Sequence, residues 1–214
     1  MKKLINKTII LLLFVALTGC NDWLDVSPKA DMKAEDLFGT EAGFRDALVG
    51  VYALMCGTNS YGRDLTYGYL DVLAQYYNSP LKTTSSGYEH NFKNAAEYKY
   101  TEKTEESRIS SIWSNHFSAV ANINQAMLFI DENKGVFTSP EVHDVYKGEF
   151  LALRAFLHFD ILRLFAPSAA MNNNKGLDAL AIPYVDVFTN IAQPQLTVME
   201  VLKKIETDLI AAKQ

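Results

Sequence analysis

Cysteine is scarce in this chain: its 214 residues include two, Cys20 and Cys56. Two cysteines cannot build a framework of several disulfides, and they cannot supply the thiolates of a cysteine-ligated structural zinc site. The fold must therefore be stabilised by the burial of apolar side chains.

Motifs that carry catalysis are also missing. The histidines, which could act as bases or metal ligands, are His90, His116, His143 and His158. They form no His-Glu-x-x-His pair, and the sequence has no Gly-x-Ser-x-Gly elbow, phosphate-binding loop or dinucleotide fingerprint. Two carboxylates across a cleft would suit a glycosidase, but an acidic chain supplies many such pairs. We therefore expect neither an enzyme nor a bound metal or other cofactor.

No apolar run in the sequence reaches the roughly 20 residues that a membrane-crossing helix needs. The run from Ile9 to Leu17 follows a start with three lysines and is closed by Leu17-Thr18-Gly19-Cys20. A basic start, a short apolar middle and a small-residue end are typical of a secretory signal peptide. The Leu-Thr-Gly-Cys ending resembles the bacterial lipobox. We expect cleavage after residues 1–19 and lipidation of Cys20; the alternative is an ordinary signal peptide with a chance cysteine.

Lipidation would anchor the chain to a membrane, because each buried methylene contributes about 0.8 kcal/mol and a lipoprotein cysteine carries several acyl chains. An acylated Cys20 also leaves Cys56 without an intramolecular disulfide partner. Without the three lysines of residues 1–19, the mature chain has 17 basic and 25 acidic residues, a net charge of −8. Such an acidic chain is a poor partner for nucleic acid, whose binding depends on basic contacts to phosphate.

Apolar spacing predicts that the chain after a lipid-anchored segment, residues 20–39, is an all-α domain over residues 40–214. Amphipathic helices are expected over 41–55, over 107–131, from 140 to a stop at Pro167, and after 197. Thr40 and Ser139 are expected as N-caps, and Thr197 with Glu200 forms a capping box. Wide apolar stripes on consecutive helices predict tetratricopeptide-like stacked pairs, although the strict tetratricopeptide consensus is absent.

About fifty residues separate the first two predicted helices, far more than the usual connection. We refer to this segment, residues 56–106, as the insertion. Within it, apolar spacing predicts a short helix from Leu65 to Tyr77, followed by a polar, irregular stretch over 78–104. The predicted fold is therefore a set of stacked helix pairs with a long, partly irregular insertion.

Eight of the eleven tyrosines lie between residues 61 and 100. Tyrosine combines a flat apolar face with a polar tip, which suits binding surfaces that are partly wet, and sugars present apolar C–H faces rimmed by hydroxyls. The candidate ligand-binding residues are Tyr77, Asn78, Tyr88, Tyr98, Arg63 and Asp64. Tyr69 and Tyr76 share the apolar stripe of the short helix, so these two are expected to pack. The alternative is that all the rings simply pack the insertion against the helices.

Three further residues are expected to have structural roles. Trp113 lies on the apolar stripe of the second predicted helix, and Leu157 lies on that of the third. Arg154 is expected to form an ion pair or a contact between helices, since a charge on an apolar helix needs a partner when it is buried.

Several stretches, taken in order, resemble one known family. They are CNDWLDVSP at 20–28, ALVGVY at 47–52, Trp113 with Asn122 and Asn124, GEFLALRAFLHF at 148–159, AIPY at 181–184, and the helix start at Thr197. The chain is identified by them as resembling the SusD/RagB family, surface lipoproteins with which Bacteroidetes capture nutrients, usually glycans. Ala166-Pro167 differs from the aromatic-Gly pair that the family often has there.

The resemblance implies a tetratricopeptide-like scaffold on the surface of the outer membrane and a TonB-dependent transporter as partner. It also implies an oligosaccharide or other nutrient as ligand. Members of the family are usually longer, so this chain is expected to be an N-terminal portion. The leading hypothesis is a binding protein that delivers a nutrient to the transporter. The alternatives are a helical scaffold that docks the transporter without a ligand of its own and, third, a glycan hydrolase.

Overall fold

The computed structural model describes residues 33–77, 91–171 and 175–213. The expected signal peptide, Cys20 and two binding candidates, Asn78 and Tyr88, lie outside the described residues. The chain divides into two units, Met1–Ala34 and Glu35–Gln214, and the packing described below is that of the second. Among the helices of the described residues, none combines the length and apolarity that crossing a membrane requires.

Helices make up most of the described chain, and strand-like pairing within it is limited to a bridge between Leu180 and Thr197. The predicted all-α fold class is therefore confirmed. The helices are α2 (Ala34–Leu37), α3 (Glu41–Met55), α4 (Tyr69–Leu73), α5 (Lys93–Ala96), α6 (Lys103–Ile130), α7 (Pro140–Phe165) and α9 (Val198–Ala212). Two short 3₁₀ turns cover Lys134–Val136 and Gly176–Asp178.

The caps predicted for three long helices are present. The Thr40 hydroxyl accepts a hydrogen bond from the backbone N–H of Gly43 at 3.1 Å, and Ser139 caps α7 ahead of Pro140. At α9 the capping box is complete, because the backbone N–H of Thr197 donates to Glu200 Oε2 at 2.8 Å and the Glu200 N–H donates to the Thr197 hydroxyl at 3.2 Å. These caps satisfy backbone donors that have no partner within the helix.

Two boundaries differ from the prediction. Helix α6 begins at Lys103 instead of residue 107. Apolar spacing missed this start because the first turn is polar and carries no apolar periodicity, although Glu105 and Glu106 favour a helix start. The short helix predicted from Leu65 to Tyr77 is confined to α4, and turns occupy the chain before it.

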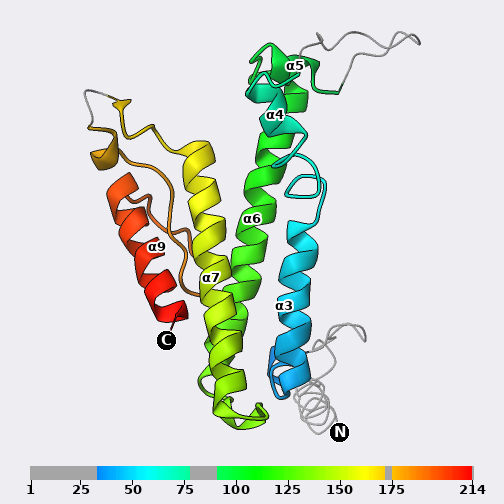
Figure 1. Cartoon of the computed structure of the whole chain (residues 1–214), viewed down its shortest axis with the longest axis vertical. Coiled ribbons are helices and arrows are strands. Elements are labelled where there is room, and N and C mark those ends of the chain that lie inside the picture. The colour runs from blue at the N-terminus through cyan, green and yellow to red at the C-terminus, as the bar shows by residue number, and fades with distance from the viewer. Residues whose placement is uncertain (1–32, 78–90, 172–174, 214) are drawn as a thin grey trace, which may run out of the picture. The chain divides into compact units, whose positions relative to one another are not determined.

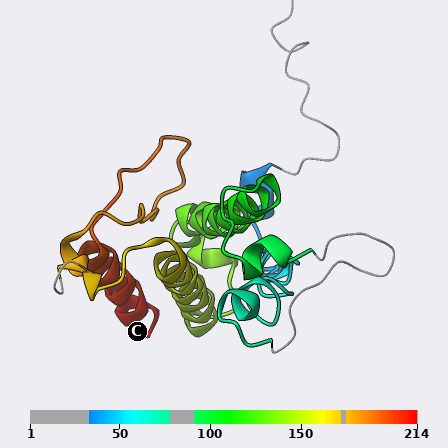
Figure 2. The same ribbon diagram turned by 90° about the horizontal axis from the view of Figure 1, so that it is seen from above.

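Helices α3, α6, α7 and α9 pack in that order, each antiparallel to the next (Figures 1 and 2). The stacked helix pairs of the predicted fold are thus present. Phe44 is fully buried near the start of α3, with its ring centroid 4.9 Å from that of Phe137. Between α7 and α9 the core contains Ile161, Ile182 and Val201, all at most 1% exposed. Apolar burial of this kind is the main source of stability here.

A buried ion pair links α7 to α9. The Arg154 guanidinium donates to both Asp208 carboxylate oxygens, at 2.6 and 2.8 Å, and to the Asn124 side-chain oxygen on α6 at 2.9 Å. The Tyr184 hydroxyl donates to the same carboxylate at 2.5 Å. Arg154 therefore holds three helices together. Leu157, one turn later on α7, is 1% exposed.

Candidate functional site

The insertion presents a group of exposed tyrosines around α4 and α5. These two short helices contact each other, and α5 also contacts α6 (Figure 1). The exposed rings, from 46% to 75% accessible, are Tyr67, Tyr76, Tyr77, Tyr98 and Tyr100. We call these five residues the tyrosine surface. A cluster of exposed aromatic rings is unusual on a surface that binds nothing, because each ring loses the favourable burial of a large apolar area.

Three of these rings have their hydroxyl groups tied to the backbone. The Tyr67 hydroxyl donates to the carbonyl oxygen of Gly62 at 3.1 Å, and the Tyr77 hydroxyl donates to that of Tyr67. The Tyr98 hydroxyl donates to the carbonyl oxygen of Leu73 at 2.9 Å. Their polar tips are thereby engaged, and the ring faces are the part left for a ligand. The Tyr98 and Tyr100 ring centroids lie 6.2 Å apart, at an interplanar angle of 53°.

Two candidates from the sequence, Tyr77 and Tyr98, belong to this surface. Tyr69, expected to pack, is 4% exposed. The same expectation for Tyr76 is wrong, since its side chain is 75% exposed. Helix α4 ends before Tyr76, and Gln75 adopts a left-handed backbone conformation with φ of 57°, so the apolar stripe does not continue.

Arg63 and Asp64, the other described candidates, belong to an ion cluster with Arg108 of α6. Asp64 is 1% exposed, with one carboxylate oxygen 2.7 Å from Arg63 Nε and the other 3.2 Å from Arg108 Nη1. The Arg108 guanidinium also lies over the Phe92 ring, 4.5 Å from its centroid. Both Asp64 oxygens are therefore engaged, one within the insertion by Arg63 and the other by Arg108 of α6, which leaves them poorly placed to bind a ligand.

Glu105 completes this cluster, and sequence reasoning missed it. The residue is fully buried on the first turn of α6, its two carboxylate oxygens have no hydrogen-bond partner, and Oε2 lies 3.5 Å from Arg108 Nε. Burial raises the pKa of the Glu105 carboxyl, and the neighbouring Arg108 opposes this. A polar first turn looks like an exposed one in sequence, so no pattern indicated this burial.

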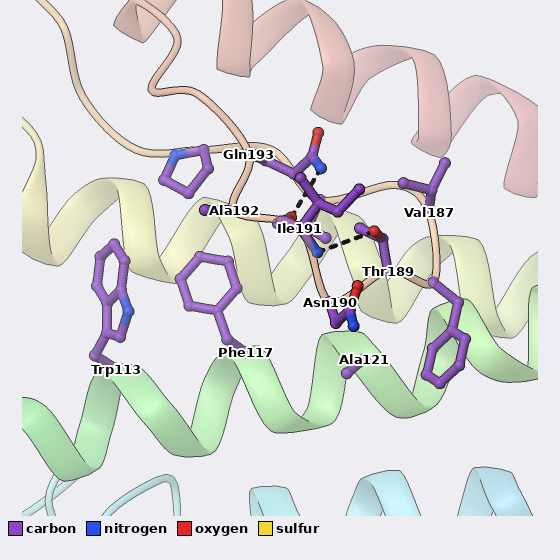
Figure 3. Close-up of a pocket in the computed structure, with 12 residues that line it drawn as sticks. Trp113, Phe117, Ala121, Val187, Thr189, Asn190, Ile191, Ala192 and Gln193 are labelled. Carbon is purple, nitrogen blue, oxygen red and sulfur yellow. Dashed lines mark hydrogen bonds between the residues drawn. The ribbon is translucent and has the colours of Figure 1, made fainter.

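A second feature is a groove of about 380 Å³ between α6 and the loop after Ile182. Trp113 and Phe117 of α6 form its floor, and loop residues 187–193 form its other wall (Figure 3). The groove is lined by no charged side chain, and Val187, Phe188 and Ile191 are more than half exposed beside it. Trp113 also packs edge-on against Phe165 at 5.0 Å. Within the described residues, no group of three or more His, Cys, Asp or Glu side chains is placed to hold a metal.

Three solved structures share the fold of this chain. A SusD superfamily protein of Bacteroides thetaiotaomicron is 20% identical, with a TM-score of 0.63 over 81% of this chain and 36% of its own length. A SusD superfamily protein of Bacteroides vulgatus is 21% identical, with a TM-score of 0.60 over 81% of this chain and 37% of its own length. A SusD-like carbohydrate binding protein of Bacteroides vulgatus is 20% identical, with a TM-score of 0.61 over 81% of this chain and 35% of its own length. The chain thus spans little more than a third of their length.

A family model matches residues 22–214, nearly the whole of the chain after the expected signal peptide. Its description is starch-binding associating with outer membrane; it names binding and no reaction, in agreement with the expectation of a protein that is not an enzyme. No curated protein matches the chain. Because the family model covers nine-tenths of the sequence, the chain belongs to the SusD-like family, whose members are described as binding starch in association with the outer membrane.

Proposed function

We propose that this chain acts in a lipid-anchored receptor on the outer-membrane surface that binds a glycan, or a related nutrient, at the tyrosine surface. The observation that carries the proposal is the set of exposed rings in the insertion, with tethered hydroxyls and free faces. The description of the family supports a starch-like ligand and a place at the outer membrane.

Stacking is the interaction that this surface suits best. A sugar ring has an apolar C–H face that a tyrosine face can cover, and covering it removes apolar area of both from water. A stacked aromatic residue at the centre of a binding site can contribute on the order of 2 kcal/mol or more. Tyr77 and Tyr98, each about half exposed, have the area left to make such contacts.

Mutation of the rings tests this proposal. Tyr77→Ala and Tyr98→Ala, made in the full-length chain, should weaken maltoheptaose binding more than tenfold for at least one of the two, measured by titration calorimetry. Tyr52→Ala is the matched control, because Tyr52 is also exposed but lies on α3. Circular dichroism should be unchanged in all three, whereas Tyr69→Ala should lower the melting temperature because Tyr69 is buried.

Delivery to a TonB-dependent transporter is the second half of the proposal, and it rests on the family resemblance. We expect the chain to co-purify from detergent-solubilised membranes with the transporter encoded beside it. If both ring variants bind maltoheptaose like the parent, the glycan is held elsewhere and the tyrosine-surface proposal is wrong. If the parent itself binds none of a panel of glycans while the transporter still co-purifies, the chain is a docking scaffold without its own ligand.

A further inference from the structure

Helices α4 and α5 end in the same way. Gln75 lies two residues after the last residue of α4 and has a φ of 57°, and Tyr98 lies two residues after the last residue of α5 and has a φ of 55°. A left-handed residue commonly ends a helix, but glycine is the usual choice, because the Cβ of any other residue is strained in that conformation. Two strained residues at equivalent places indicate that their side chains are needed.

The side chains of these two residues bond the opposite helix. Gln75 Nε2 donates to the carbonyl oxygen of Ala96, the last residue of α5, at 3.1 Å, and to that of Val72 in α4 at 3.2 Å. The Tyr98 hydroxyl donates to the carbonyl oxygen of Leu73, the last residue of α4, at 2.9 Å. Carbonyls at the end of a helix have no partner within it, so each helix end is completed by the residue that terminates the other.

We propose that Gln75 and the Tyr98 hydroxyl form a clasp that sets the spacing of the tyrosine surface before a ligand arrives; this inference rests on the proposed function. Tyr76 and Tyr77 follow Gln75 directly, whereas Tyr98 and Tyr100 belong to the other helix end. The clasp joins these two pairs of rings. Gln75 is thus a positioning residue that touches no sugar, and Tyr98 has two roles: its hydroxyl holds the helix and its ring contacts the ligand.

A fixed spacing of the rings favours binding, because helix ends that became ordered only in the complex would lose conformational entropy on binding and so lower the affinity. One hydrogen bond is worth about 1 kcal/mol net, so opening the clasp should weaken binding about fivefold. Because the Tyr98 hydroxyl already donates its proton to the carbonyl oxygen of Leu73, Tyr98 offers a ligand its ring face and not a hydrogen-bond donor.

Hydrogen exchange tests the clasp without any ligand. Gln75→Gly keeps the left-handed turn and removes the amide, and Tyr98→Phe keeps the ring and removes the hydroxyl. In both variants of the full-length chain, the amides of residues 93–100 should exchange about fivefold faster, with the α7 amides and the melting temperature unchanged. Gln193→Ala is the matched control, since the Gln193 amide bonds only within its own loop, to the carbonyl oxygen of Ile191.

Maltoheptaose titration then tests positioning. Each single clasp variant should bind maltoheptaose about fivefold more weakly than the parent. The double variant should bind about as weakly as either single variant, because one lost bond already opens the clasp. Gln75→Lys should bind like the parent, because its ammonium can donate to the same carbonyl oxygens. Unchanged exchange overturns the clasp whatever the ligand is. Faster exchange with unchanged affinity overturns the positioning role. If the parent itself fails to bind maltoheptaose, the starch-like ligand of the proposed function is wrong, and the exchange data alone decide the clasp.

Discussion

His158 uses both of its ring nitrogens in the core between α7 and the loop after Ile182. Nδ1 lies 2.8 Å from the carbonyl oxygen of Arg154, so it must donate, and Nε2 accepts the backbone N–H of Val185 at 3.0 Å. The imidazole also stacks on the Tyr184 ring, with centroids 4.0 Å apart. Only the neutral ring can make both bonds. Burial, aided by the charge of Arg154, lowers the pKa of His158 to about 4.

Acid should therefore destabilise the protein before its carboxylates are neutralised. In the unfolded chain the histidine has its ordinary pKa of 6.5, so between pH 6.5 and 4 it takes up a proton that the folded chain excludes. The free energy of unfolding should fall by up to about 3 kcal/mol across this window. Urea unfolding at several pH values checks this, and His158→Gln should show a shallower slope. Buried His116, whose pKa is also lowered, adds to the slope in both proteins; equal slopes would contradict the assignment.

Leu157 and Val145 lie on the same helix and differ in burial, 1% against 65% exposed. Leu157→Ala leaves a cavity in the core and should lower the free energy of unfolding by about 2–5 kcal/mol. Val145→Ala, the control, should change it by less than about 0.5 kcal/mol. Urea titration measures both, and similar midpoints for the two variants would show that Leu157 contributes little to the core.

Among single residues, the sequence predicted best those whose environment depends on their own helix. Leu157 lies on a continuous apolar stripe, and burial followed from that spacing. The predicted burial of Tyr76 was wrong because a turn at Gln75 interrupts the apolar stripe. Glutamine is not a residue type that indicates a left-handed turn, so nothing in the sequence indicated it. Asp64 suggested a polar binding residue, yet its partner Arg108 is 44 residues away, and such long-range pairing has no local signal.

Replacing a glycine by alanine should have opposite effects on stability in helices α7 and α3. A Cβ on Gly148 of α7 would lie 2.7 Å from the carbonyl oxygen of Ala212, at the end of α9, whereas a Cβ on Gly50 of α3 would meet nothing within 4 Å. Gly148→Ala should separate the two helices and destabilise the fold by about 1–3 kcal/mol. Gly50→Ala should stabilise it by about 0.5–1 kcal/mol, because alanine loses less entropy in a helix. Thermal melting of both variants checks the signs.

Helix positions were predictable where capping residues mark them, at α3, α7 and α9. The start of α6 was missed because its first turn is polar and carries no apolar periodicity, although Glu105 within it is buried. Helices α4 and α5 are stabilised mainly by each other and by the core residues Leu65 and Ala95, not by propensity, since such short helices are unstable alone. The groove beside Trp113 likewise depends on a loop that reaches α6 from far along the chain.

For the whole molecule, the expected lipid anchor gives the simplest test. Cys20 is the acceptor that the lipobox-like ending predicts, so Cys20→Ala should move the protein from the membrane fraction to the soluble one and abolish labelling by radioactive fatty acid. Cys56→Ala is the control, because Cys56 is exposed and lies after α3. Labelling that persists without Cys20 would rule out this anchor.

The spacing of the helices along the chain also sets the order in which they can meet. Residues 131–139 alone join α6 to α7, whereas residues 56–102 separate α3 from α6. Closing a longer loop costs more entropy, so α6 and α7 should dock first and α3 last. Until then the side chains of Phe44 and Val51, fully buried in the finished fold, stay exposed to other chains. Pulse-labelled refolding should show the α7 amides protected before those of α3, and a holding chaperone should slow the second step alone.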